Sequence, residues 1–212
     1  MKLTNTCLLA LAGVALATSA HADGIYSEGF DNLAGSGWVL ANNSSPAGQS
    51  WYQGVSEIFA AQDGAAGSYA SANFLSALGG SGSISNWLIS PEINLGGATS
   101  LSFYVRTEAT DGYLDAVNVY FNAGSSSATA SFTTLLTAVT ATQGWTQYTV
   151  NLPTAATGRI AFEYVVGNAD DANVIGIDTV QIAAAVPEPT TYALMGLGLA
   201  GLAALRRRRS AD

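Results

Sequence analysis

The chain has 212 residues, of which 15 are Asp or Glu and seven are Lys or Arg, and its formal net charge at pH 7 is −8. It contains one Lys, one Cys and one His, and these are Lys2, Cys7 and His21, all near the N-terminus. Beyond that segment, the composition excludes catalysis by His, Cys or Lys and zinc sites built from His and Cys.

The N-terminal segment has the three parts of a secretory signal peptide. Lys2 gives a positive start, residues 7–17 (CLLALAGVALA) form an apolar run, and Ala20 and Ala22 are the small residues that a signal peptidase reads. The apolar run is too short to cross a bilayer, which needs about 20 residues. We therefore predict that residues 1–22 are removed by signal peptidase after Ala22 and that the protein is exported.

The body of the chain, residues 23–185, is strongly acidic. It keeps two arginines, Arg106 and Arg159, against 13 carboxylates, which is a formal charge of −11. Without cysteine it has no disulfides, so a hydrophobic core must stabilise it, and its length suffices for one domain. The charge argues against nucleic acid and anionic membranes as partners.

Apolar residues recur with period two along the body, and Gly, Ser, Asn and Thr fill the positions between them. In chain order, this pattern predicts strands at 101–105, 117–121, 146–152, 160–165 and 175–182. In the stretch WLISPEINL (87–95), Pro91 cannot donate to a sheet and therefore marks an edge or a bulge. No segment of the body keeps a helical period over three turns, so we predict an all-β fold, an antiparallel β-sandwich of the jelly-roll type.

An acidic group follows the first of these predicted strands. Glu108, Asp111 and Asp115 lie in RTEATDGYLDAV, with Asp111-Gly112 in the position of a turn apex. A catalytic interpretation would make two of them an acid and a base. We favour a solvated turn between two strands.

Four blocks of the body together resemble a known family. They are SEGFDNLAGSGW (27–38), the stretch from 86 to 107, the stretch from 144 to 167 and VIGIDTVQI (174–182). In this order they look like the choice-of-anchor J domain, a jelly-roll relative of the cleaved-adhesin and MAM-like domains. The resemblance covers nearly all of residues 23–185 and implies one jelly-roll domain there.

The resemblance also implies a structural Ca²⁺ between the first and last strands. The matching positions are Glu28, Asp31 and Asp178, and calcium prefers such hard oxygen ligands. The chain departs from the family pattern at Asn42-Asn43 and at Thr179, where relatives carry further acidic residues, which implies a weaker or altered site. The alternative is that Asp31 and Asp178 only cap turns.

Aromatic residues offer a second kind of candidate site. The four tryptophans, Trp38, Trp51, Trp87 and Trp145, lie near the ends of predicted strands, where they either complete the core or present a ring face to a sugar. We expect Trp51, Tyr52 and Tyr113 to be the more exposed aromatic residues and hence the candidates for stacking on a glycan.

The C-terminal segment, residues 186–212, begins with Pro187, Glu188 and Pro189. A hydrophobic stretch from 190 to 205 follows, about 24 Å long as a helix, and then comes a cluster of Arg206, Arg207, Arg208 and Arg209. A plain membrane anchor, with the arginines on the cytoplasmic side, is one interpretation. The order of the three features resembles the PEP-CTERM sorting signal. That implies an exosortase, a membrane transpeptidase that removes the helix after transient anchoring in the inner membrane.

These expectations combine into a prediction of function. We predict an exported, non-catalytic protein of the cell surface or extracellular matrix that is associated with exopolysaccharide or biofilm. One alternative is a calcium-assisted, carbohydrate-binding lectin or adhesin on the same jelly roll. A second is a carboxylate-based glycan hydrolase.

Overall fold

The computed structural model describes residues 24–96, 99–109, 111–184, 196 and 198. The predicted signal peptide and nearly all of the predicted sorting signal, including its hydrophobic helix, lie outside these residues. Within the described residues, no helix has the length and hydrophobicity to cross a membrane. The described residues from 24 to 184 form one compact unit.

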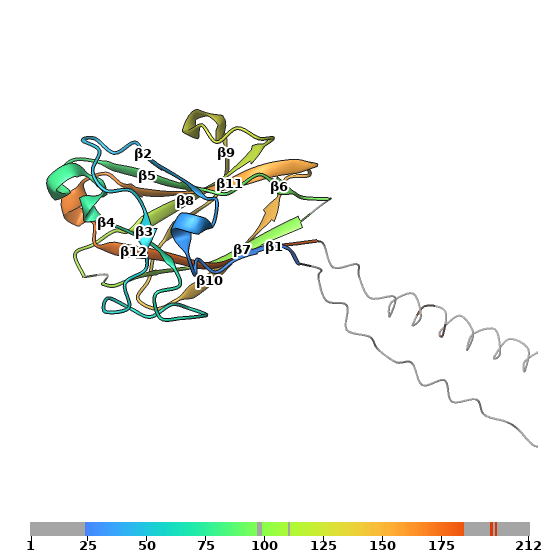
Figure 1. Ribbon diagram of the computed structural model, residues 1–212, viewed down its shortest axis with the longest axis horizontal. Coiled ribbons are helices and arrows are strands. Elements are labelled where there is room, and N and C mark those ends of the chain that lie inside the picture. Colours follow the sequence, from blue (N-terminus) through green and yellow to red (C-terminus); the bar gives the residue numbers. More distant parts are fainter. Residues whose placement is uncertain (1–23, 97–98, 110, 185–195, 197, 199–212) are drawn as a thin grey trace, which may run out of the picture. The chain divides into compact units, whose positions relative to one another are not determined.

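Twelve strands form two six-stranded antiparallel sheets that pack face to face (Figure 1). Sheet A has the order β10-β7-β12-β4-β3, and β1 also pairs with β12. Sheet B has the order β2-β5-β11-β8-β9, and β6 also pairs with β11. The strands are β1 Gly24–Glu28, β2 Val39–Asn42, β3 Tyr52–Gln53, β4 Ala70–Asn73, β5 Ile84–Ile89, β6 Ile93–Asn94, β7 Thr99–Thr107, β8 Ala116–Ala123, β9 Thr134–Thr140, β10 Thr146–Leu152, β11 Thr157–Val166 and β12 Val174–Ala184. The predicted antiparallel β-sandwich is confirmed.

The five strands predicted from the sequence correspond to β7, β8, β10, β11 and β12. The break predicted at Pro91 is also confirmed, because it separates β5 from β6, which both pair with β11. Ile89 pairs with Ala161 and Ile93 pairs with Gly158, so one strand has four steps where its partner has three. This is the geometry of a bulge.

The core lies between the sheets and follows from the alternation of side chains along each strand. In β11, Ile160, Phe162, Tyr164 and Val166 all belong to the main hydrophobic cluster. Phe162 is fully buried and contacts Trp38 and Phe103 across the core, with ring centres 6.0 and 5.0 Å away. The period of two in the sequence therefore identifies the inward face correctly.

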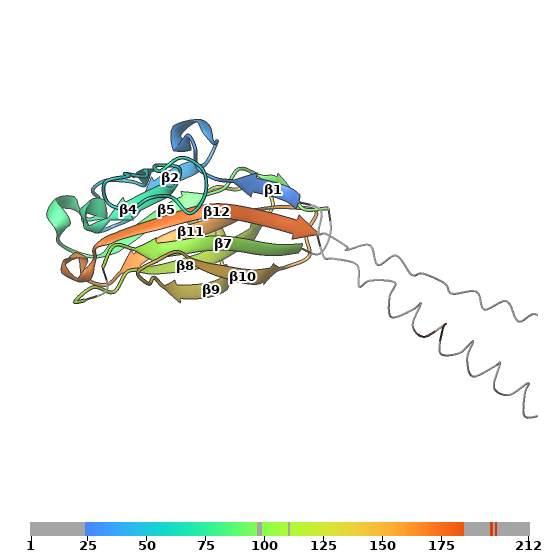
Figure 2. The same ribbon diagram turned by 90° about the horizontal axis from the view of Figure 1, so that it is seen from below.

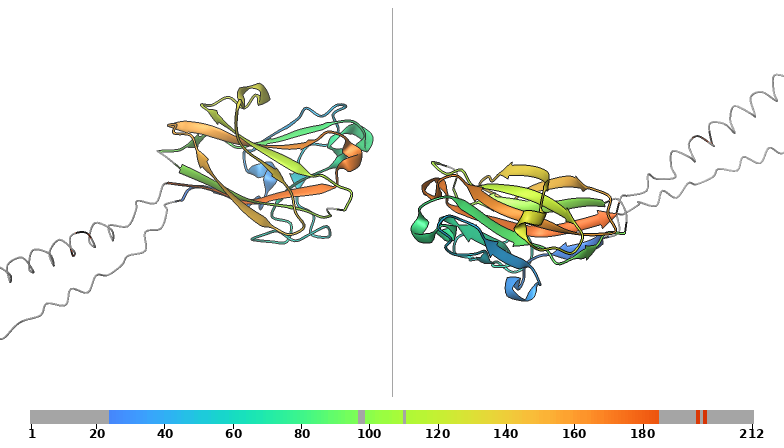
Figure 3. Two further views of the ribbon diagram at one scale, coloured as in Figure 1. Left: turned by 180° about the vertical axis from the view of Figure 1, so that it is seen from behind. Right: turned by 90° about the horizontal axis from the view of Figure 1, so that it is seen from above.

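The two ends of the sandwich carry different features. Gly24 at the start of β1 pairs with Ala183 near the end of β12, so the chain enters and leaves the domain at one end. The opposite end, here called the distal end, carries three short 3₁₀ segments, η2 Phe74–Ser76, η3 Leu78–Gly80 and η5 Ala169–Asp171 (Figure 2). The connection between β7 and β8 lies at the distal end as well (Figure 3).

Candidate functional site

The turn after β1 positions the first two predicted calcium ligands. Glu28 ends β1, and its Oε1 accepts a hydrogen bond of 2.7 Å from the backbone N–H of Phe30. Phe30 has a positive φ of 52°. Its ring is fully buried and packs edge-on against Trp38, and this packing stabilises the unusual backbone conformation. Asp31 follows Phe30 and lines the same hollow as Glu28.

Asp178, the third predicted ligand, lies at a bulge in β12 where the pairing with β7 shifts. Its side chain is fully buried, and its Oδ2 accepts hydrogen bonds from the backbone N–H groups of Gln62, at 2.7 Å, and Asp63, at 3.2 Å. Its Oδ1 accepts a third hydrogen bond, from Thr179 N–H at 2.5 Å. Burial raises the pKa of this carboxyl group, and the three N–H donors oppose the rise. Asp178 thus fastens the segment 54–68 to the outer face of sheet A.

Two further hydrogen bonds hold this segment. The Thr179 hydroxyl donates to Gln62 Oε1 at 2.7 Å, and the Trp145 indole N–H donates to the carbonyl oxygen of Ala60 at 2.9 Å. Thr179 has a positive φ of 48°, which is unusual for a β-branched residue. The bonds to Gln62 and Asp178 fix it in that conformation.

Aromatic packing completes the attachment. The Phe59 ring stacks on Tyr69, with ring centres 4.8 Å apart, and meets Trp145 edge-on at 5.7 Å. The Arg106 guanidinium carbon lies 4.2 Å from the centre of the same ring. A Cβ on Gly176 would lie 2.8 Å from the Phe59 ring, so glycine is needed where the segment crosses β12.

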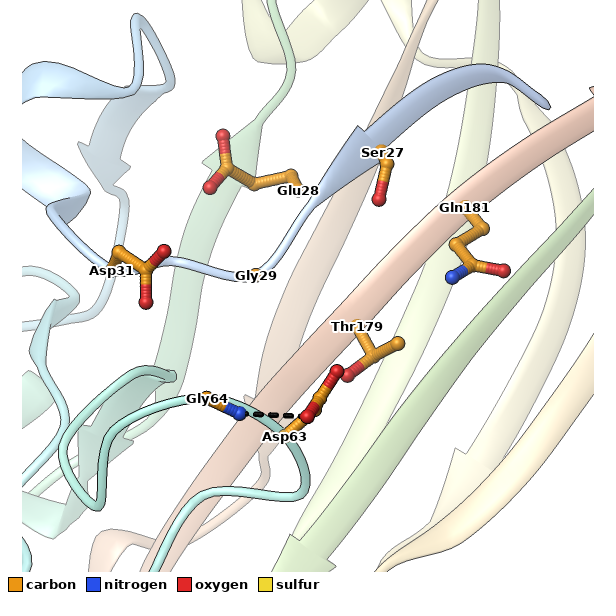
Figure 4. A pocket seen from close by; sticks show the side chains of 8 residues that line it. All are labelled: Ser27, Glu28, Gly29, Asp31, Asp63, Gly64, Thr179 and Gln181. Carbon is orange, nitrogen blue, oxygen red and sulfur yellow. Dashed lines mark hydrogen bonds between the residues drawn. The ribbon is translucent and has the colours of Figure 1, made fainter.

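The attached segment completes an acidic hollow of about 130 Å³ beside the turn after β1 (Figure 4). Its wall combines the first turn, the tip of the 54–68 segment and the outer side of β12. The lining residues are Ser27, Glu28, Gly29, Asp31, Asp63, Gly64, Thr179 and Gln181.

Each of the three carboxylates in the hollow uses one oxygen for a hydrogen bond. Glu28 Oε1 accepts from Phe30 N–H, as described above. Asp31 Oδ1 accepts from the Ser68 hydroxyl at 2.6 Å, and Asp63 Oδ1 accepts from Gly64 N–H at 2.8 Å. The second oxygen of each carboxylate has no hydrogen-bond partner among the described residues. These oxygens are available to a cation or to a ligand with donor groups.

The oxygen atoms that line the hollow are of the types that bind calcium. Carboxylate, hydroxyl and amide oxygens are present, and calcium takes six to eight such hard ligands. Among the described residues, however, no three acidic, His or Cys side chains are grouped closely enough to hold a metal alone. Neutral oxygens, such as those of Ser27, Thr179 and Gln181, would have to complete the set. The structure brings Glu28 and Asp31 together on the hollow and places Asp178 behind it.

A larger groove of about 410 Å³ adjoins the hollow. It lies between β2, an edge strand of sheet B, and β3, an edge strand of sheet A, beside the 3₁₀ segment η1 Leu33–Gly35. The lining is more apolar than polar, and its residues are Asp31, Asn32, Leu33, Ala34, Leu40, Trp51, Tyr52 and Gln53. Asp31 lines both the groove and the hollow, so the two are adjacent.

Gln53 fixes the wall of this groove. Its Oε1 accepts from Leu33 N–H at 2.8 Å, and its Nε2 donates to the carbonyl oxygens of Phe30 and Gly67 at 2.7 and 2.6 Å. Half-buried Tyr52 accepts a hydrogen bond of 3.0 Å from Asn73, and burial raises the pKa of its hydroxyl. Tyr52 therefore remains a neutral donor at the groove.

The three aromatic residues predicted to stack on a glycan differ in burial and in position. Trp51 is 3% exposed, and its indole N–H donates to the Asn86 carbonyl oxygen at 3.0 Å. The expectation that Trp51 is exposed is wrong, because its ring belongs to the core and contacts Tyr164 edge-on. Tyr52 lines the groove, whereas exposed Tyr113 lies at the distal end, away from it.

The structure also corrects the interpretation of the acidic group after β7. Glu108 and Asp111 are exposed as predicted, but Asp115 is 2% exposed. Its Oδ1 accepts from the Tyr164 hydroxyl at 2.5 Å and from Asn173 N–H at 3.0 Å, and its Oδ2 accepts from the Thr107 hydroxyl at 2.6 Å. The solvated-turn prediction is therefore wrong for Asp115. The sequence does indicate the burial of Asp115. It lies two residues before inward-facing Val117, just ahead of β8, and side chains two residues apart along a strand share one face.

No pattern in the sequence identifies Asp63 as a site residue. It lies in AQDGAAGS, a stretch with no periodic pattern, and only the docking of this segment on sheet A brings it to the hollow. The residues Ala20, Ala22, Pro187, Glu188, Pro189 and Arg206 to Arg209 lie outside the described residues.

Comparison with known protein families gives two matches. The model of the Cleaved Adhesin Domain matches residues 25–182, and the PEP-CTERM protein-sorting motif matches residues 185–209. A search of curated proteins found no match. The sorting motif and the adhesin domain indicate an exported, cell-surface, adhesin-like protein that is processed by an exosortase-type system.

Solved structures agree with the family match. The K1 Cleaved Adhesin domain of Lys-gingipain from Porphyromonas gingivalis W83 is 24% identical, with a TM-score of 0.62 over 75% of this chain and 97% of that one. The K3 domain of the same protein is 23% identical, with a TM-score of 0.62 over 77% of this chain and 99% of that one. At these identities the likeness shows a shared fold. Because the family model spans more than half of the chain, the protein belongs to the Cleaved Adhesin Domain family.

Proposed function

We propose that this protein is sorted to the outer surface by an exosortase and is held in the exopolysaccharide layer there because its domain binds carbohydrate. The observation that carries the proposal is that the groove lies beside the acidic hollow and shares Asp31 with it. The groove has the volume of a small-molecule site, which is about 300–1,000 Å³. Leu40 offers an apolar surface to a sugar ring, and Tyr52 offers a hydroxyl donor.

Calcium in the hollow would assist this binding. Glu28, Asp31 and Asp63 would hold the ion, and an excess of acidic residues raises the local concentration of divalent cations. A bound calcium supplies positive charge and open coordination positions for sugar hydroxyls. Asp178 acts behind the site, where it positions Asp63 through the backbone.

We propose binding rather than hydrolysis. Glycoside hydrolysis uses two carboxyl groups on either side of the scissile bond, about 5–9.5 Å apart. The groove is lined by one carboxylate, Asp31. Its remaining polar groups are amides and a phenol, which bind sugars but do not replace a second acid.

The sorting step predicts the mass of the mature protein. We expect protein recovered from culture to lack residues 1–22 and the segment from 190 to 212, because both are cleaved during export. Intact mass spectrometry measures this directly. A mass that still includes residues 190–212 would replace sorting by a plain membrane anchor.

The binding site predicts two separable effects. Asp31→Asn is expected to weaken calcium binding, measured by titration calorimetry with calcium alone, by at least about tenfold, or about 1.4 kcal/mol. Leu40→Ser, which adds no charge beside the hollow, is expected to leave calcium binding unchanged and to abolish retention on an array of oligosaccharides that includes the exopolysaccharide of the producing strain. Asp170→Asn, an exposed carboxylate at the distal end, is the matched control for Asp31.

Three results would contradict parts of the proposal. If no saccharide on the array is retained, the domain has a display role only. If retention is the same in a chelator, calcium takes no part. If purified protein shortens the polysaccharide, the hydrolase alternative replaces binding.

A further inference from the structure

Exposed apolar side chains are concentrated at the distal end of the sandwich. Eight large hydrophobic residues are exposed among those that the structure describes, and five of them lie at this end, with exposures from 38 to 65%. These five, the tip patch, are Phe74, Leu75, Leu78, Tyr113 and Leu114. An apolar cluster of this kind on a soluble domain marks an interaction surface.

The tip patch is assembled from segments far apart in the chain. Phe74 N–H donates to the Asn173 carbonyl oxygen at 3.0 Å, and Leu114 N–H donates to the Asp171 carbonyl oxygen at 2.8 Å. The residues from η5 to Asn173 therefore lie between the 3₁₀ segments η2 and η3 and the β7–β8 connection (Figures 1 and 3). Leu78 is fixed separately, since its N–H donates to the Pro46 carbonyl oxygen at 2.9 Å.

A buried charge makes this end rigid. Asp115 follows Leu114 directly and binds Tyr164, Thr107 and the Asn173 backbone from beneath the patch. The exposed leucine is thus held on an ordered backbone. An ordered apolar surface loses less conformational entropy on binding than a mobile loop does.

Acidic side chains lie among the apolar ones. Asp170 and Asp171 are exposed on η5, between the two apolar groups, and Asp111 is exposed in the β7–β8 connection. The two arginines of the described residues are engaged elsewhere, because Arg159 donates to the Ser90 and Ser125 carbonyl oxygens and Arg106 lies over the Phe59 ring. β12 ends at the other end of the domain, so the tip patch is far from the last residues of this strand.

We propose that the tip patch is a docking surface for a protein partner that presents an amphipathic segment with apolar and basic residues. The apolar side chains of the partner would cover the leucines, and its lysines or arginines would pair with the exposed aspartates. A second copy of this chain is a poor occupant, because two acidic surfaces would face each other. This inference concerns a surface separate from the carbohydrate groove.

The test uses two peptides and the protein recovered after export. An amphipathic helical peptide of Leu and Lys, about 14 residues long, is expected to bind, and its counterpart of Leu and Glu is not. The double variant Leu78→Ser/Leu114→Ser is expected to weaken binding of the Lys peptide by at least about tenfold. Asp170→Asn/Asp171→Asn is expected to lower the salt dependence of binding.

Leu135→Ser is the matched control, because Leu135 is 51% exposed on β9, outside the tip patch. Equal weakening by Leu135→Ser, or equal binding of the Glu peptide, would overturn the proposal. So would a dimer in sedimentation equilibrium that the Leu78 and Leu114 changes dissolve, or a saccharide whose retention they abolish. Calcium binding should be the same in all these variants, so failure here is distinguishable from failure of the carbohydrate site.

Discussion

Asp115→Ala is expected to lower the free energy of unfolding by about 3–5 kcal/mol, the cost of removing one partner from a buried charged network. The change leaves the Tyr164 hydroxyl and the Asn173 N–H without their acceptor, whereas the Thr107 hydroxyl can still donate to the Val174 carbonyl oxygen at 2.9 Å. Each such buried group costs about 1–3 kcal/mol. Removing the side chain also leaves a small cavity.

The protonation state of Tyr164 explains why a carboxylate is needed at this position. Burial and the adjacent charge of Asp115 raise the pKa of Tyr164, so its hydroxyl remains a donor. The buried Tyr164 hydroxyl therefore requires an acceptor. The two carboxylate oxygens of Asp115 accept from this hydroxyl, from Asn173 N–H and from the Thr107 hydroxyl. Asn at 115 would offer one acceptor and place an NH₂ group against another donor.

Urea unfolding followed by tryptophan fluorescence measures the effect, and Trp51, edge-on to Tyr164, is a reporter close to the change. Asp111→Ala is the matched control, since this exposed residue of the same connection should change stability by less than about 0.5 kcal/mol. Combining Asp115→Ala with Tyr164→Phe tests the coupling, and we expect the double variant to lose less than the sum of the two single changes. A loss below about 1 kcal/mol for Asp115→Ala would show that the network contributes little.

The sequence predicts the long strands well for a physical reason. β7, β8, β10, β11 and β12 are long enough for the period of two to repeat, and each has one face in the core. The two-residue strands β3 and β6 contain no period at all, and their pairing is set by neighbours distant in the chain. Sequence patterns therefore do not find strands as short as these.

The candidate site is predictable only in part, because it joins distant segments. Glu28 and Asp31 stand in the first block, and the turn that aligns them is local. The contact of Gln62 with Asp178 spans 116 residues, and it depends on Phe59 fitting over Gly176. Trp51 shows the same limit, since both it and Tyr52 line the groove, yet the Trp51 side chain is almost fully buried in the core.

Asp178→Ala is expected to release the segment 54–68 from sheet A and to lower the free energy of unfolding by about 2–3 kcal/mol. The N–H groups of Gln62, Asp63 and Thr179 lose their acceptor when this buried carboxylate is removed. Phe59 and the bond from Trp145 to Ala60 remain, so we expect local opening rather than complete unfolding. Amide exchange at Gln62 and Asp63, measured without calcium, should become at least about tenfold faster.

The calcium-free measurement separates two roles for Asp178. If it positions Asp63 by fastening the backbone, exchange accelerates in the absence of any metal, and calcium binding weakens as a consequence. If it were a direct ligand, calcium binding would weaken while the amides of the metal-free protein kept their protection. Asp63→Ala is the matched control, because this exposed residue lines the hollow and its side chain accepts a hydrogen bond only from the N–H of its neighbour Gly64. It should weaken calcium binding and leave both stability and amide exchange unchanged, since nothing else in the fold depends on its side chain.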